Sequence, residues 1–414
     1  KTRALFRQFK NNVPDAYYNF LRSDKSGFPE YLDEKVFRNE IKNAESEARN
    51  LTLGPDNNRI EKLIREVLDR KEFILIGGPP CQAYSLIGRS RMKGVEDFES
   101  DERHVLYKHY LSVIAEFKPA VFVMENVKGL LSSKLNGEPV FENIRKDLSN
   151  PGLAVNQGNG QSLRYNIYSF TGTDNSLLPG FAELKPADFV IKSENFGIPQ
   201  ERHRVILLGI RNDLGVLPDQ IPILKKSPPF SIEDAIKDLP KLRSRLSNSI
   251  ENRELIGSDN FENWKFVLSI LPEIISSDIK ILNEEINKVI HEIDEDKYEI
   301  ETGERFKRYE IRQKEAGRFI KENLDWFHDE RIGGVINHES RSHIASDLQR
   351  YLWCSVYAKI NNTSPRLHDF PEELIPNHKN AKVGKKGHFP DRFKVQLSNQ
   401  PSKTITSHIS RDGH

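Results

Sequence analysis

A cysteine held in a rigid turn is the first residue of this chain whose surroundings suggest chemistry. The sequence Gly-Gly-Pro-Pro-Cys-Gln at residues 77–82 follows the apolar run 73–76. Four apolar residues before a Gly/Pro turn predict a short strand that is buried on both faces, and open parallel sheets bind ligands at the carboxyl ends of their strands. A lone cysteine is as often a small buried hydrophobe, but the two prolines that fix Cys81 favour a nucleophile.

A glutamate follows the next predicted strand. Residues 104–117 have helical periodicity, Pro119 ends that helix, and the apolar residues 120–124 lead directly into Glu125. Strand, helix and strand form a βαβ unit, so the two strands are predicted to be parallel with a right-handed crossover. Cys81 and Glu125 then leave the same edge of the sheet. A carboxyl group at a strand end is more often solvated or a helix cap, but beside a candidate nucleophile we interpret it as functional.

Two arginines precede a third apolar strand at residues 205–210. Arg202 and Arg204 flank His203, and this alternation puts both guanidinium groups on one side of an extended segment. They lie at the start of their strand, so they reach the edge that holds Glu125 only if that strand is antiparallel to the others, which mixed sheets allow. An ordinary basic pair on the surface is the alternative.

A thiolate, a carboxyl group and a guanidinium together suit conjugate addition to a pyrimidine. The thiolate would add to C6 while the carboxyl group hydrogen-bonds N3, and C5 could then take a methyl group from a sulfonium donor. The guanidinium would anchor the C2 carbonyl. Nearby cations would favour ionised Cys81, and burial would help Glu125 to hold a proton. A base in a duplex would first have to leave its stack.

Three motifs in this order resemble the DNA (cytosine-5) methyltransferases. They are Gly-Pro-Pro-Cys-Gln at 78–82, Glu-Asn-Val at 125–127 and Gln-x-Arg-x-Arg at 200–204. The resemblance covers residues 73–210 closely, while 337–394 and 401–406 are more loosely similar to the bacterial restriction-modification branch. It implies that Cys81 is the nucleophile, that Glu125 is the partner of N3, and that Arg204, with Arg202, anchors the base and Glu125.

The same resemblance implies a cofactor, S-adenosyl-L-methionine, and a double-stranded DNA substrate. Pro80 and Leu106 would line the cofactor pocket, and residues 84–103 would form a loop that closes over DNA. The basic segment 376–394 contains two phenylalanines and suits contact with phosphates. The candidate DNA contacts are Gln82, Ser85, Arg89, Arg91, Lys385 and Lys386.

The fold class implied by the resemblance is α/β, with a Rossmann-like methyltransferase sheet that contains one antiparallel strand and a mostly helical target-recognition domain. We expect a catalytic domain at 1–244, the target-recognition domain at 245–395, and the start of a return segment at 396–414. The family's opening strand and Phe-x-Gly-x-Gly cofactor loop have no match before Cys81, and its closing motifs are also missing. The chain is therefore expected to be truncated at both ends.

The net charge and the cysteine content limit the classes of protein to which this chain could belong. The 414 residues carry a net charge of +1, so no global basic field indicates nucleic acid, although a local basic cleft is compatible with this total. The cysteines are Cys81 and Cys354, without a CxxC pair, which indicates neither a disulfide framework nor a thiolate zinc site. We expect Cys354 in a helical core, no metal, a cytoplasmic monomer, and no membrane span.

Several readings remain open from the sequence. The preferred one is DNA cytosine-5 methylation, with functional pairing to a cognate restriction endonuclease. An RNA cytosine-5 methyltransferase is the alternative within the family, and a catalytically inactive DNA-binding relative is the alternative from another class. A cysteine hydrolase would need a histidine partner for Cys81, and no motif places one.

Overall fold

The computed structural model falls into two compact units, one of residues 49–228 and one that combines residues before 49 with those from 229 onwards. Among the described residues, no helix is long and apolar enough to cross a membrane. The functional domains expected at 1–244, 245–395 and 396–414 follow other limits and remain a prediction. The described residues are 13–23, 34–69, 71–79, 107–135, 137–155, 163–171, 184–249, 257–275, 280–295, 300–310, 315–376 and 393–404.

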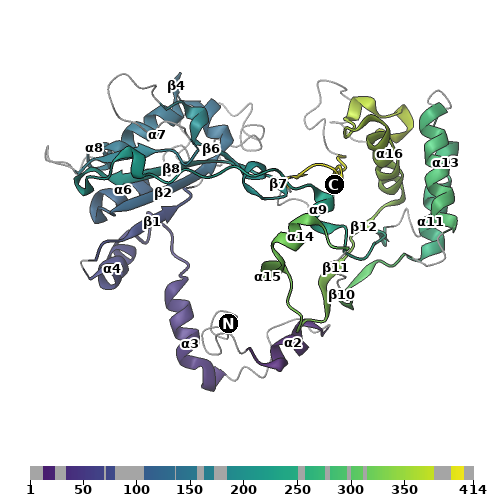
Figure 1. Ribbon diagram of the computed structural model, residues 1–414, viewed down its shortest axis with the longest axis horizontal. Helices are drawn as coiled ribbons and strands as arrows, with labels where there is room; N and C mark the ends of the chain where they lie inside the picture. Colours follow the sequence, from purple (N-terminus) through teal and green to yellow (C-terminus); the bar gives the residue numbers. More distant parts are fainter. Residues whose placement is uncertain are drawn as a thin grey trace. The chain divides into compact units, whose positions relative to one another are not determined.

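A mixed five-stranded sheet forms the centre of the unit of residues 49–228 (Figure 1). Its strand order is β1-β2-β8-β5, and β6 also pairs with β8. β1 is parallel to β2, whereas β8 is antiparallel to β2, β5 and β6. The expected parallel pair and the reversed third strand are therefore both found. The strands are β1 (Ile74–Gly77), β2 (Val121–Val127), β5 (Tyr165–Tyr168), β6 (Val190–Lys192) and β8 (His203–Arg211).

Side chains alternate between the two faces of β2, as the pleat of a strand requires. Phe122, Met124 and Asn126 are buried, and the residues between them are only partly buried. Phe122 and Met124 pack in one apolar cluster with Leu111 and Ile114 of α6, the helix predicted at 104–117 and found at Tyr107–Phe117. The burial pattern thus sends Glu125 and Asn126 to opposite faces of the same strand.

Two glycines let aromatic rings lie directly on the sheet. A Cβ atom on Gly77 would overlap the ring of Tyr110, and a Cβ atom on Gly209 would overlap the ring of Phe122. Tyr110 belongs to α6, and its hydroxyl donates a 3.1 Å hydrogen bond to the Val123 carbonyl. Both glycines therefore fix how closely neighbouring elements approach.

The expectation that the first strand is buried on both faces is wrong. Ile74 is 63% exposed and Ile76 is 76% exposed, although Leu75 packs into the cluster around Tyr110. β1 stands at the end of the strand order, and only its face with Leu75 and Gly77 is covered. An apolar run cannot distinguish a strand covered on both faces from an edge strand that is covered on one.

The remaining elements of this unit are short or peripheral. These elements are α4 (Asn57–Leu68), α7 (Val140–Ser149), α8 (Pro151–Ala154), β3 (Lys134–Leu135), β4 (Glu138–Pro139), β7 (Gln200–Glu201), and the 3-10 helices η2 (Lys128–Ser132), η3 (Pro186–Phe189), η4 (Ser193–Phe196), η5 (Asn212–Leu214) and η6 (Pro218–Gln220).

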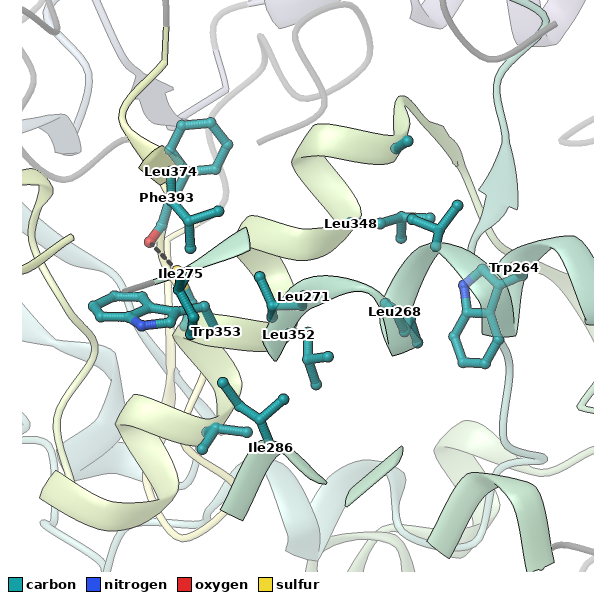
Figure 2. Packing of buried hydrophobic residues seen from close by; sticks show 14 of the residues in the cluster. Trp264, Leu268, Leu271, Ile275, Ile286, Leu348, Leu352, Trp353, Leu374 and Phe393 are labelled. Carbon is teal, nitrogen blue, oxygen red and sulfur yellow. Dashed lines mark hydrogen bonds between the residues drawn. The ribbon is translucent and has the colours of Figure 1, made fainter. Parts of the chain in front are cut away.

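The other unit has a helical core (Figure 2). Trp353 and Leu352 of α16 (Ala345–Asn361) lie against Leu271 of α12 (Leu271–Ile274) and Ile286 of α13 (Lys280–Glu295). Its further elements are α2 (Asp15–Leu21), α3 (Glu34–Glu47), α9 (Ile232–Ile236), α11 (Phe261–Ser269), α14 (Arg318–Glu322), α15 (Leu324–Phe327), β9 (Arg245–Leu246), β10 (Gly303–Arg308), β11 (Gly334–Glu339), β12 (Ser342–His343), β13 (Ser402–Lys403), η7 (Leu367–Asp369) and η8 (Glu372–Leu374).

Cys354 lies inside this helical core, as expected. It is fully buried, and its Sγ is 3.7 Å from the Phe393 carbonyl oxygen. Burial raises the pKa of the Cys354 thiol to about 12. The thiol is therefore protonated at neutral pH, which makes it a poor nucleophile.

Candidate active site

The turn that precedes the cysteine begins directly beside Glu125. In the parallel pair, Gly77 lies opposite Met124, so Gly78 leaves β1 where Glu125 stands on β2. A Cβ atom on Gly78 would lie 3.0 Å from Glu125 Oε2 and 3.7 Å from the Glu125 carbonyl oxygen. A side chain at residue 78 would force the carboxylate or the turn to shift by a few tenths of an ångström.

Arg204 contacts the same carboxylate from the antiparallel strand. Its Nε is 2.6 Å from Glu125 Oε1. Because Glu125 pairs with Ile206 in the ladder, Arg204 is its diagonal neighbour on the same face of the sheet. Both side chains are partly exposed, so this ion pair contributes about 1 kcal/mol or less to stability. Its main effect is to hold the carboxylate beside the guanidinium group.

Asn126 contacts Pro79, which precedes the undescribed segment that contains Cys81. Its side chain is only 2% exposed, and Nδ2 lies 3.5 Å from the Pro79 carbonyl oxygen, a long hydrogen bond. Its Oδ1 accepts a 2.9 Å hydrogen bond from the Val127 backbone N–H. Sequence analysis gave Asn126 no role of its own. The alternation of side chains along a strand is the signal that could have placed it opposite Glu125.

Arg202 is arranged differently from Arg204. It lies in the break between β7 and β8, where its backbone N–H donates a 2.9 Å hydrogen bond to Ser193 Oγ. Within the described residues, Glu125 forms an ion pair with Arg204 and none with Arg202. We expected alternating side chains to place both guanidinium groups on one side of an extended segment. In the part of the chain that the structure describes, only the guanidinium group of Arg204 pairs with the Glu125 carboxylate.

A hydrogen bond between two side chains supports the start of β8. His203 Nε2 is 2.8 Å from Glu194 Oε1, and the His203 carbonyl oxygen accepts a 2.8 Å hydrogen bond from Arg204 Nη1. Ser193 Oγ lies 2.6 Å from the Gln200 carbonyl oxygen and so closes the same loop. Sequence reasoning missed Glu194 because no periodic spacing connects it to residues nine positions later.

The remaining candidate residues lie outside the described residues, and their roles stay predictions. No group of three or more His, Cys, Asp and Glu side chains that could hold a metal occurs in the described part of the chain. The undescribed candidates are the nucleophile Cys81, the cofactor residues Pro80 and Leu106, and the DNA contacts Gln82, Ser85, Arg89, Arg91, Lys385 and Lys386.

Comparison with known proteins gives a consistent result. The family model for C-5 cytosine-specific DNA methylase matches residues 34–168 and 184–381, which is most of the chain. Type II methyltransferase M.Bpa9945I of Bacillus paralicheniformis is 27% identical over 410 residues, covering 97% of this chain and 72% of its own length. Type II methyltransferase M.XorII of Xanthomonas oryzae pv. oryzae is 31% identical over 171 residues, 41% of this chain and 30% of that protein.

A third relative matches about a third of this chain. Type II methyltransferase M.NgoFVII of Neisseria gonorrhoeae is 34% identical over 142 residues, which is 34% of this chain and 28% of that protein. The match thus spans most of M.Bpa9945I but less than a third of M.XorII and M.NgoFVII.

Proposed function

Because the chain belongs to the C-5 cytosine-specific DNA methylase family, we propose that it methylates C5 of a cytosine in duplex DNA through a covalent adduct of Cys81. DNA cytosine-5 methyltransferase activity follows from family membership, while the adduct and the assignment of residues are our proposal. The observation that carries it is the carboxylate of Glu125, which Arg204 holds at 2.6 Å beside the start of the cysteine turn.

The first step is addition of the Cys81 thiolate to C6 of the cytosine. A carbon–sulfur bond forms, and the electrons of the C5–C6 double bond move toward C5 and the N3 side of the ring. Glu125 supports this step when its carboxyl group hydrogen-bonds N3 and supplies a proton there. Arg204 occupies Glu125 Oε1, which leaves Oε2, the oxygen beside Gly78, for the base.

The second step forms the new carbon–carbon bond. S-adenosyl-L-methionine, when bound, would provide a methyl group on a sulfonium whose departure leaves a neutral thioether. C5 of the cytosine would take that methyl group, a proton acceptor would remove the C5 proton, and the carbon–sulfur bond would break to release the Cys81 thiolate. N3 would return its proton to Glu125, which restores the carboxyl group and leaves neutral 5-methylcytosine. Pro80 and Leu106 are the residues proposed to hold the donor, and they lie outside the described residues.

The proposed substrate is a base that has been rotated out of the duplex. Nucleophilic attack on C6 and a hydrogen bond to N3 both need faces and edges of the base that stacking and pairing cover. The candidate contacts in 82–91 and 385–386 would hold the DNA backbone, and residues 245–395 would read the sequence in the grooves. The type II methyltransferase relatives support a role beside a cognate restriction endonuclease.

A duplex that carries 5-fluorocytosine tests this proposal. Fluorine cannot leave C5 as a proton does, so full-length protein with S-adenosyl-L-methionine should form a persistent covalent complex that is retained on a denaturing gel. Cys81→Ser should abolish the complex. Cys354→Ala is the matched control and should retain it, since the Cys354 thiol is buried and its pKa is raised to about 12.

Three other results would contradict the proposal in different ways. An adduct on RNA with none on DNA would establish the RNA methyltransferase alternative. DNA binding without an adduct on either nucleic acid would indicate a catalytically inactive relative. An adduct that persists in Cys81→Ser would show that another residue is the nucleophile.

A further inference from the structure

The pair of Glu194 and His203 is linked to the proposed catalytic carboxylate by two hydrogen bonds and an ion pair. Glu194 Oε1 is 2.8 Å from His203 Nε2. The His203 carbonyl oxygen accepts from Arg204 Nη1 at 2.8 Å, and Arg204 Nε is 2.6 Å from Glu125 Oε1. The hydrogen bond to His203 and the ion pair to Glu125 use different nitrogens of one planar group, so together they restrain its orientation as well as its position.

The backbone of His203 is the point where the two pairs meet. His203 is the first residue of β8 and pairs with Lys192 at the end of β6. Glu194 belongs to η4, which follows β6 directly. A bond from Glu194 to the imidazole therefore ties η4 to the first residue of β8, whose carbonyl holds Arg204.

Stability alone gives a poor account of the contact between Glu194 and His203. The Glu194 side chain is 16% exposed and that of His203 is 26% exposed, so both lose much of their hydration. Glu194 Oε2 is buried and has no hydrogen-bond partner among the described residues. Burying a carboxylate with one oxygen unpaired costs free energy, and apolar residues often replace partly buried ion pairs without loss. The contact instead restrains the His203 backbone, whose carbonyl oxygen binds Arg204, and apolar residues would not provide this restraint.

We propose that Glu194 and His203 are positioning residues for methyl transfer. Glu194 holds the imidazole of His203, the His203 carbonyl holds the Arg204 guanidinium, and Arg204 holds the Glu125 carboxylate toward N3 of the base. This inference rests on the proposed function of Glu125 and Arg204. It assigns a role in the reaction to two residues that do not touch the base.

The first test is the rate of covalent complex formation with the 5-fluorocytosine duplex at saturating DNA and S-adenosyl-L-methionine. Glu194→Ala should lower this rate about tenfold to a hundredfold, since a small misplacement of reacting groups has effects of this size. The dissociation constant for DNA should stay unchanged. Glu194→Gln should recover most of the rate, because its amide can donate to or accept from either imidazole tautomer.

A double-variant cycle separates positioning from a general structural role. Arg204→Lys keeps the positive charge but lacks the planar group that contacts both the His203 carbonyl and the Glu125 carboxylate. If Glu194 acts through Arg204, Glu194→Ala should change the rate by no more than about twofold in the Arg204→Lys background. Glu142→Ala is the matched control, because Glu142 forms a 2.8 Å ion pair with Arg145 in the same unit. It should leave the rate unchanged.

The outcomes distinguish this inference from the proposed function. If the unaltered protein forms no adduct, the proposed function fails. If it forms the adduct and Glu194→Ala reacts at the same rate, the positioning role alone is overturned. Equal fractional losses in the native and Arg204→Lys backgrounds would also overturn it. If Glu194→Ala unfolds, His203→Asn decides, because its side chain is too short to span to Glu194 and the same slow adduct formation is expected.

Discussion

At the scale of residues, the two oxygens of the Glu125 carboxylate have different neighbours. Oε1 is bound by Arg204, whereas Oε2 lies near Gly78 at the start of the cysteine turn. The carboxylate is thus restrained on one side and approached by backbone on the other. A Cβ atom at residue 78 would crowd Oε2, at 3.0 Å from it.

Gly78→Ala is predicted to impair methylation more than folding. The added Cβ would lie 3.0 Å from Glu125 Oε2, a distance that forces the carboxylate or the turn to move by a few tenths of an ångström. We expect the rate of methyl transfer to fall about tenfold, with a thermal midpoint within about 2 °C of the original. Radioactive methyl transfer and calorimetry measure the two effects. Unchanged methyl transfer would show that the carboxylate adjusts without consequence.

Sequence reasoning recovered part of the site at this scale. Glu125 and Arg204 could be brought together in advance because each adjoins an apolar strand and strand direction limits where they meet. Glu194 and His203 could not, since their contact depends on a 3-10 turn whose geometry no periodic pattern encodes. The role of Cys81 remains a prediction.

At the scale of elements, the reversed direction of β8 places the arginine at the site. β8 pairs antiparallel with β2, so its first residues lie beside the last residues of β2, and Arg204 pairs with Val127. A parallel β8 would put the same arginine at the opposite edge of the sheet. Sequence patterns located these strands well, but they overestimated the burial of β1 because the hydrophobicity of a strand does not report its neighbours.

Gly209→Ala is predicted to destabilise the sheet-containing unit. A Cβ atom there would overlap the Phe122 ring, which is fully buried between β2 and its neighbours. Overpacking of this kind costs about 1–3 kcal/mol, which denaturant-induced unfolding measures. The double variant Phe122→Leu, Gly209→Ala should lose less than the sum of the two single variants, because the smaller side chain leaves room. Full additivity would show that the two residues are not coupled.

At the scale of the whole molecule, chain segments far apart in sequence build one unit. The Tyr18 hydroxyl of α2 donates a 2.8 Å hydrogen bond to Asp329 Oδ2, and Arg331 Nη2 is 2.8 Å from Asp15 Oδ1. Arg331 also lies over the Tyr18 ring at 4.1 Å from its centroid. No local pattern in the sequence predicts a contact between residues more than 300 positions apart.

Arg331→Ala is predicted to loosen α2. The substitution removes the ion pair to Asp15, the 2.7 Å hydrogen bond to the Val13 carbonyl and the stacking on Tyr18. Backbone amides of α2 should then exchange severalfold faster in hydrogen–deuterium exchange, since local opening needs fewer broken contacts. Amides of α16 should be unaffected. Unchanged exchange in α2 would mean that the Tyr18–Asp329 contact and the small apolar cluster of Val13 and Tyr18 suffice.

The alternation of β2 also constrains how this protein can change over evolutionary time. Glu125 and Asn126 are neighbours in the chain, yet they serve opposite faces of the sheet. Substitutions elsewhere in the strand alter one face at a time, but an inserted or deleted residue before Glu125 would exchange the two faces together. The carboxylate would then enter the core, and the amide would meet Arg204. β2 can therefore vary in composition but not in length.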